Sequence, residues 1–163
     1  MTTINPQAVR GPVTAVPVVA GTGIRFVEDA QNNRVLAEID ETVLWEDDTG
    51  IAATGESAQL SESIANFSRV AVYSQPIYGG PEIRNEFQVM DSTYRFGTFS
   101  QDGSNVFIAA YNMTISNKTI SILRGRRVTI ASGGTITTTD LSATGSYKAP
   151  IRKVVGINRI ASN

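Results

Sequence analysis

The sequence contains no cysteine and no histidine. Without cysteine the chain can form no disulfide, no cysteine zinc site and no thiol nucleophile. Without histidine it lacks the most common general base and transition-metal ligand, which excludes a Ser-His-Asp triad and an HExxH zinc site. Any catalysis would have to rely on carboxylates or lysine. We therefore expect a protein that is not an enzyme and that needs no metal or cofactor.

The sequence also lacks an excess of charge of either sign and a long apolar run. Lys and Arg number 14 and Asp and Glu 15, so no overall field favours nucleic acid or an anionic membrane. No stretch approaches the roughly 18 apolar residues of a membrane span. The first residues, MTTINPQAVRG, lack the cationic start and apolar run of a signal peptide. We expect a soluble chain that binds no nucleic acid and does not insert into membranes.

Apolar residues make up 41% of the 163 residues and charged residues 18%, enough apolar surface for a folded core. Short runs rich in β-branched and aromatic residues alternate with Gly, Asn, Asp and Ser turns, and no helix-period segment is long enough to indicate an α/β fold. This pattern predicts an all-β chain with an antiparallel, jelly-roll-like β-sandwich. The expected strands are 24–29, 33–39, 42–45, 69–75, 83–91, 93–100, 106–116, 119–124, 128–131 and 153–160.

Composition divides the chain into three parts. In residues 1–45, prolines interrupt the first segment and favour an extended arm that lies along a partner or adds to a sheet edge, and a short β-hairpin follows. Residues 46–57, EDDTGIAATGES, read as a linker. Residues 58–163 carry the predicted sandwich.

The hairpin cannot cover its own apolar residues, because an isolated two-stranded hairpin is marginally stable in water. Oligomerisation is the simplest source of a covering surface. We expect an oligomer whose core contains Phe26, Leu36, Val43, Leu44 and Trp45.

Two acidic groups are candidate sites. Glu46, Asp47 and Asp48 could bind a hard cation such as Ca²⁺, but they lack the alternating ligand spacing of an EF-hand loop, which favours a solvated linker. Glu82 and Glu86 could serve as a glycosidase carboxylate pair, but nothing in the neighbouring sequence supports that activity.

Two other features are candidate binding surfaces. Residues 124–127, RGRR, form the densest basic cluster, and Arg126 and Arg127 could contact phosphate or an anionic sugar. The simpler interpretation is a hairpin tip whose charges discourage edge pairing. Tyr78, beside Gly79 and Gly80, could offer a flat ring to a carbohydrate, although aromatic residues in strands more often belong to the core.

Two segments resemble fibre proteins of tailed phages. Residues 18–46, VVAGTGIRFVEDAQNNRVLAEIDETVLWE, resemble the N-terminal segments of head-fibre and related fibre proteins. The stretch LSESIANFSRVAVYSQ and the last strand, KVVGINRI, are similar to the small β-sandwich heads of phage fibres and receptor-binding proteins.

The resemblance implies a homotrimer with an N-terminal part that attaches to the virion and a distal part that projects outward. The arm would bind the major capsid protein or another virion protein, and a host-surface glycan is a further candidate partner. The resemblance leaves open a head fibre or a tail-associated receptor-binding protein. The absence of shaft repeats and coiled-coil heptads favours a head fibre on the capsid exterior, made in the cytoplasm of the bacterial host. The arm residues expected to contact the capsid are Ile4, Pro6, Val9, Pro12, Val13 and Pro17.

Overall fold

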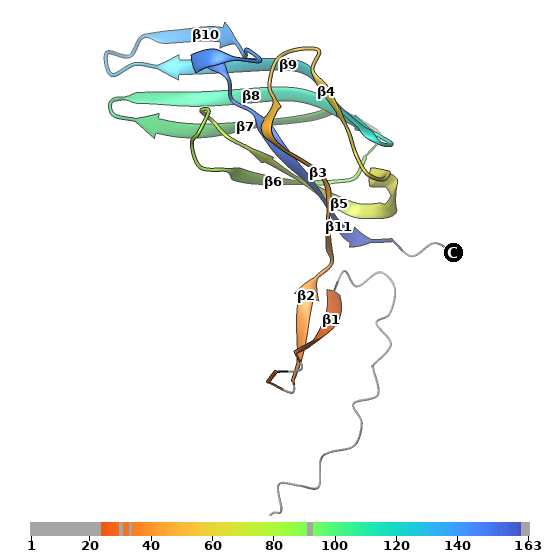
Figure 1. Cartoon of the computed structure of the whole chain (residues 1–163). Coiled ribbons are helices and arrows are strands. Elements are labelled where there is room, and N and C mark those ends of the chain that lie inside the picture. Colours follow the sequence, from red (N-terminus) through yellow and green to blue (C-terminus); the bar gives the residue numbers. More distant parts are fainter. Residues whose placement is uncertain (1–23, 30, 33, 91–92, 161–163) are drawn as a thin grey trace, which may run out of the picture.

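The computed structural model of the chain describes residues 24–29, 31, 32, 34–90 and 93–160. These residues confirm the predicted all-β class: they form two large antiparallel sheets and a separate two-stranded hairpin (Figure 1). Two short 3-10 turns, η1 (Ile64–Asn66) and η2 (Gly145–Tyr147), complete the described secondary structure.

The first large sheet has the strand order β3-β11-β5-β6 and is called the β11 sheet here. Its strands are β3 (Glu41–Ile51), β11 (Ile151–Arg159), β5 (Phe67–Ser74) and β6 (Ile83–Gln88). The central position of β11, paired with β3 on one side and β5 on the other, makes the last described strand the axis of this sheet.

The second large sheet has the order β10-β9-β8-β7 and is called the β8 sheet here, with β4 pairing with the first residues of β9. Its strands are β7 (Thr93–Asp102), β8 (Asn105–Ser116), β9 (Thr119–Ile130), β10 (Ile136–Asp140) and β4 (Ser57–Gln59). Short turns join β7 to β8 and β8 to β9, and Asn117 in the second turn has the positive φ that asparagine tolerates.

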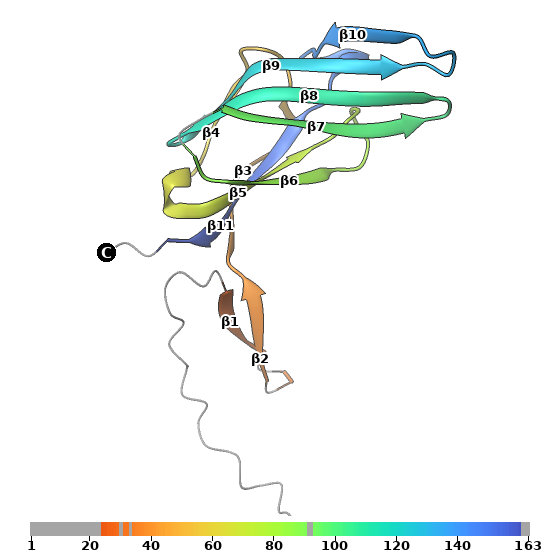
Figure 2. The same cartoon turned by 180° about the vertical axis from the view of Figure 1, so that it is seen from behind.

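The two sheets pack face to face over one hydrophobic core, and Figure 2 shows β11 crossing beneath β8 and β9. Burial alternates along β8, where Tyr111, Met113 and Ile115 face the core. From the β11 sheet, Val72 and Val154 contribute to the same core. This period of two is the signature of strands with one face buried and the other exposed.

The predicted hairpin at residues 24–39 is confirmed. Strands β1 (Ile24–Asp29) and β2 (Arg34–Ile39) pair antiparallel, with Ile24 opposite Ile39 and Asp29 opposite Arg34. The hairpin forms a sheet of its own, and Figure 1 shows it projecting from the end of the sandwich where β3 begins. Only Asp40 separates β2 from β3.

Residues 46–57, expected as a linker, lie within the sandwich instead. Strand β3 continues to Ile51, and Asp47 Oδ1 accepts hydrogen bonds from Thr49 N at 2.7 Å and Gly50 N at 2.9 Å. The pKa of Asp47 is lowered mainly by the hydrogen bond from the Thr49 side chain, and further by the backbone hydrogen bonds from Gly50 and Thr49. Glu46 and Asp48 form ion pairs with Lys153 and Arg152 of β11. The acidic run is therefore an ion-paired edge of the β11 sheet.

The basic cluster at residues 124–127 is not a hairpin tip, and that prediction was wrong. These residues lie in the middle of β9, where they pair with β8 on one side and, from Arg126 on, with β10 on the other. A close backbone contact explains why position 125 is glycine: a Cβ there would lie 2.5 Å from Ala52 O. The glycine permits close approach of another chain segment rather than a turn.

Strand β3 divides the expected trimer-core residues between two faces. A register shift between Val154 and Val155 of β11 leaves Leu44 as an extra residue in β3. Leu44 is 2% exposed in the core of the single chain, and Trp45 packs against that core. Leu44 is therefore a core residue of the single chain, and Trp45 is partly buried against the same core. Val43 lies on the outer face and is 49% exposed.

Candidate ligand-binding site

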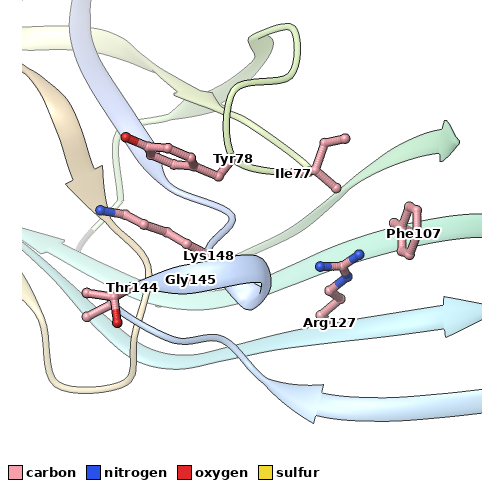
Figure 3. Close-up of a pocket in the computed structure, with 8 residues that line it drawn as sticks. Ile77, Tyr78, Phe107, Arg127, Thr144, Gly145 and Lys148 are labelled. Atoms are coloured by element: carbon pink, nitrogen blue, oxygen red, sulfur yellow. The ribbon is translucent and has the colours of Figure 1, made fainter.

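A pocket of about 530 Å³ opens between the two sheets and contains two of the three predicted surface-binding residues (Figure 3). Tyr78 reaches it from the loop after β5, and Arg127 from β9. Arg126 does not join them: neighbouring residues of a strand point to opposite faces, and Arg126 lines a different pocket. The lining residues are Ile77, Tyr78, Phe107, Arg127, Ala143, Thr144, Gly145 and Lys148.

Hydrogen bonds between two loops fix one wall of the pocket. The loop after β5 is bound to the segment before β11 through Gln75 N to Pro150 O at 2.8 Å and Tyr78 N to Lys148 O at 3.0 Å. Gln75 Oε1 also accepts a hydrogen bond from Gly79 N at 3.2 Å, and Gly79 has a φ of 78°. Tyr78 and Lys148 are thus held next to each other by main-chain bonds rather than by flexible side chains.

The buried hydroxyl of Tyr111 anchors the same segment from below. It donates a hydrogen bond to Ala149 O at 2.5 Å, directly beside Lys148. Burial raises the pKa of Tyr111, so the hydroxyl stays protonated and remains a donor. The pocket wall therefore rests on the packed core.

Aromatic rings and cations alternate around the pocket. The Arg127 guanidinium lies 4.1 Å from the ring centroid of Phe107 and 5.5 Å from that of Tyr147, and Lys148 Nζ lies 5.5 Å from the centroid of Tyr78. These are cation–π distances. Tyr78 is 57% exposed, so much of its surface remains free for a ligand.

The lining chemistry suits a small, partly apolar, anionic ligand. Arg127 and Lys148 bring two positive charges, and no lining residue is acidic. Tyr78 and Phe107 offer flat faces, and Thr144 a hydroxyl. A concave site with flat apolar walls and a few polar groups is the usual form of a small-ligand pocket, and an arginine favours a carboxylate.

Most of this site could not be recognised in the sequence. Phe107, Thr144 and Lys148 come from segments whose approach to Tyr78 depends on the pairing of β8 with β9 and of β11 with β5. No short-range motif marks them. The available signal was a set of aromatic and basic residues in β-rich segments, which is also the composition of an ordinary core and its rim.

The other predicted sites fall elsewhere. The arm residues Ile4 to Pro17 and the side chains of Phe26 and Leu36 lie outside the described residues. Glu86 forms ion pairs with Arg69 and Arg84, while Glu82 lies 3.8 Å from Arg152. In this arrangement the two carboxylates have separate structural partners.

The described residues also bear on metal binding and on membranes. Within them, no group of three or more acidic side chains is placed to hold a metal ion. No helix in the part of the chain that the structure describes is long and apolar enough to cross a membrane.

Comparisons with known proteins found no family model and no curated protein that matches this chain.

Proposed function

We propose that the chain is a structural phage virion protein, a homotrimeric head fibre whose N-terminal part attaches to the capsid. In this proposal the sandwich is a jelly-roll-like head domain that projects outward and takes part in adhesion. The proposal rests on the sequence resemblance and on the position of the hairpin and the pocket at opposite ends of the sandwich. It assigns no catalytic role, in keeping with a sequence that has neither histidine nor cysteine.

The observation that carries the proposal is the separation of the hairpin from the pocket. Next to the hairpin, Glu41 of β3 pairs with Ile157 near the end of β11. The pocket loops leave from the other end of the sheet, where Ile151 pairs with Ser74. These pairs lie six residue positions apart along β11, which corresponds to roughly 20 Å along a strand. The hairpin and the pocket therefore lie at opposite ends of the β11 sheet.

The isolated hairpin supports the trimer. Among the residues that the structure describes, strands β1 and β2 pair only with each other, and a two-stranded sheet of six residues a side is marginal in water. A second surface is needed to stabilise it, and equivalent hairpins around a three-fold axis would supply one. Val43, which is 49% exposed at the hairpin end of β3, is available to such an interface.

In this proposal the pocket at the outward end binds an acidic sugar of the host surface. Arg127 and Lys148 would pair with the carboxylate, and Tyr78 would lie against the apolar face of the ring. The same site would serve a tail-associated receptor-binding protein, so the position on the virion separates the two readings.

Antibody labelling of virions, viewed by electron microscopy, tests the function. Label over the capsid is expected. Label confined to the tail would show the tail-associated alternative, and particles without label would overturn the virion assignment. Adhesion of the purified protein to host cells tests the pocket: Tyr78→Ala should weaken it about fivefold or more, since truncating an aromatic residue central to a binding site costs about 1 kcal/mol or more. Phe99→Ala, which removes a 71% exposed ring outside the pocket, should leave adhesion unchanged.

A further inference from the structure

A row of arginines lies on the outer face of the β8 sheet, on the side of β9 away from Arg127. Arg95 of β7 is paired with Asn112 of β8, which in turn is paired with Arg124 of β9. Tyr94 and Met113, their neighbours in sequence, are buried in the core. Side chains alternate along a strand, so the row faces outward.

The next row along the strands forms a floor beside these arginines. It consists of Gly97, Ala110, Arg126 and, on β10, Asp140. Gly97 and Ala110 bring almost no side-chain volume, and a pocket of about 440 Å³ lies among Arg95, Arg124 and Arg126. Arg95 and Arg124 flank Asn112 from the two neighbouring strands, about 10 Å apart across the sheet, and Arg126 lies two residues beyond Arg124 on the same face. Arginine side chains are long enough to bring the three guanidinium groups to one ligand from these positions.

Positive charge in this pocket exceeds the available counter-charge. Within the described residues, Arg95 and Arg124 form no ion pair, and Arg126 meets only Asp140, with Nε 3.5 Å from Oδ1. Arg126 Nε is buried and donates no hydrogen bond to any described acceptor. Three arginines against one aspartate leave a net charge of +2. Like charges gathered on one face of a sheet repel one another, and an anion bound among them would offset that repulsion.

We propose that this pocket, defined by Arg95, Arg124, Arg126, Gly97 and Ala110, is a phosphate-binding site. A carboxylate has two oxygens and satisfies one arginine fork. A phosphate group has more oxygens and a charge close to −2, which matches the excess. The site is independent of the Tyr78 pocket, because Arg126 and Arg127 point to opposite faces of β9.

Titration of the ¹⁵N-labelled full chain with inorganic phosphate at constant ionic strength tests the assignment. The amide resonances of Gly97, Ala110 and Asn112 should shift most. Acetate should bind about tenfold more weakly, since it offers fewer oxygens to charged donors. Equal binding of acetate and phosphate would overturn the assignment, as would phosphate shifts confined to residues around Tyr78.

Two variants test the residues by different routes. The double variant Arg95→Gln, Arg124→Gln should reduce phosphate affinity by at least about tenfold, since each removes a charge-assisted donor. Gly97→Val keeps every charge but fills the floor. A Cβ at Gly97 meets only ordinary contacts, 3.5 Å from Ala109 O and 3.6 Å from Ile108 Cγ2, so the strand should tolerate valine. Gly97→Val should reduce phosphate affinity about as much as the double arginine variant does.

Arg69→Gln, on the β11 sheet, is the matched control and should bind phosphate like the wild type. Unchanged affinity in Gly97→Val would overturn the proposal even if the double arginine variant failed to fold. A soluble polyphosphate identifies the source of the group. Tighter binding than that of inorganic phosphate, per phosphate, would support a phosphate-bearing polymer, and equal binding would support free phosphate.

Discussion

At the scale of single residues, close packing at Gly156 fixes the centre of the β11 sheet. A Cβ at Gly156 would lie 2.6 Å from three ring carbons of Phe67, and Phe67 is 1% exposed. The ring therefore lies directly on the backbone of β11. The Arg159 guanidinium, 4.7 Å from the ring centroid, lies against the same ring.

We expect Gly156→Ala to lower the free energy of unfolding by about 1 to 3 kcal/mol, because the ring must shift within a packed core. Urea denaturation measures the change. Gly133→Ala is the control: a Cβ there meets nothing within 4 Å, and its effect should stay within about 0.5 kcal/mol. Equal effects of the two substitutions would show that the packing of Phe67 does not require a glycine at position 156.

Individual site residues were predictable only in part. Tyr78 and Arg127 could be selected from the sequence because an exposed aromatic beside glycines and a basic run are visible locally. Their meeting with Lys148 and Phe107 depends on pairing between strands far apart in sequence. Arg126 was selected with Arg127, yet strand geometry separates them, which a hairpin-tip interpretation of the run could not foresee.

At the scale of elements, an ion pair joins the end of β11 to the segment before β5. Glu62 accepts hydrogen bonds from Arg159 at 2.6 and 2.7 Å and from Asn66 Nδ2 at 3.0 Å. The bonds from Arg159, followed by that from Asn66, lower the pKa of Glu62 from 4.5 to about 2. This pairing holds the segment around η1 against the hairpin end of the sandwich.

The lowered pKa predicts a defined pH dependence. Because the folded pKa lies below the unfolded one, the stabilising contribution is present above pH 4.5 and is lost as the pH falls towards 2. The pair is partly exposed, so Glu62→Gln should cost about 1 kcal/mol or less near neutral pH. Denaturation of both proteins at about pH 6 and about pH 3 should show the difference shrinking on acidification. A difference that stays the same at both pH values would contradict the assigned ion pair.

Most strands were predictable from alternation and turn residues, and the exceptions have physical causes. Strands β7 and β8 were predicted within a few residues because one face is regularly apolar. Strand β9 was divided in two because its central arginines resemble a loop. Strands β4 and β10 were missed because they are short, polar and at sheet edges, where burial leaves no pattern. The acidic half of β3 was predicted as a linker because its charges are typical of a solvated segment, and their ion pairs with Arg152 and Lys153 join residues far apart in sequence.

At the scale of the whole molecule, the hairpin and the Tyr78 pocket lie at opposite ends of the sandwich. The hairpin leaves the sandwich where Glu41 pairs with Ile157, and the pocket lies beyond the pairing of Ile151 with Ser74. Attachment at one end and ligand binding at the other is the arrangement that the proposed fibre requires. The proposed trimer and capsid contact rest on the resemblance and on the separate hairpin, because they would involve surfaces beyond a single chain.

The central claim is that the N-terminal segment attaches the protein to the virion while the sandwich folds without it. Deletion of residues 2–20 keeps the hairpin strands and the complete core. The most direct test supplies full-length and truncated protein to particles that lack this chain and measures the number of copies bound per particle. We predict that the full-length protein decorates the capsid and that the truncated protein, still a soluble trimer by light scattering, does not. Decoration by the truncated protein at the full-length copy number would contradict the account and place the attachment site in the hairpin or the sandwich.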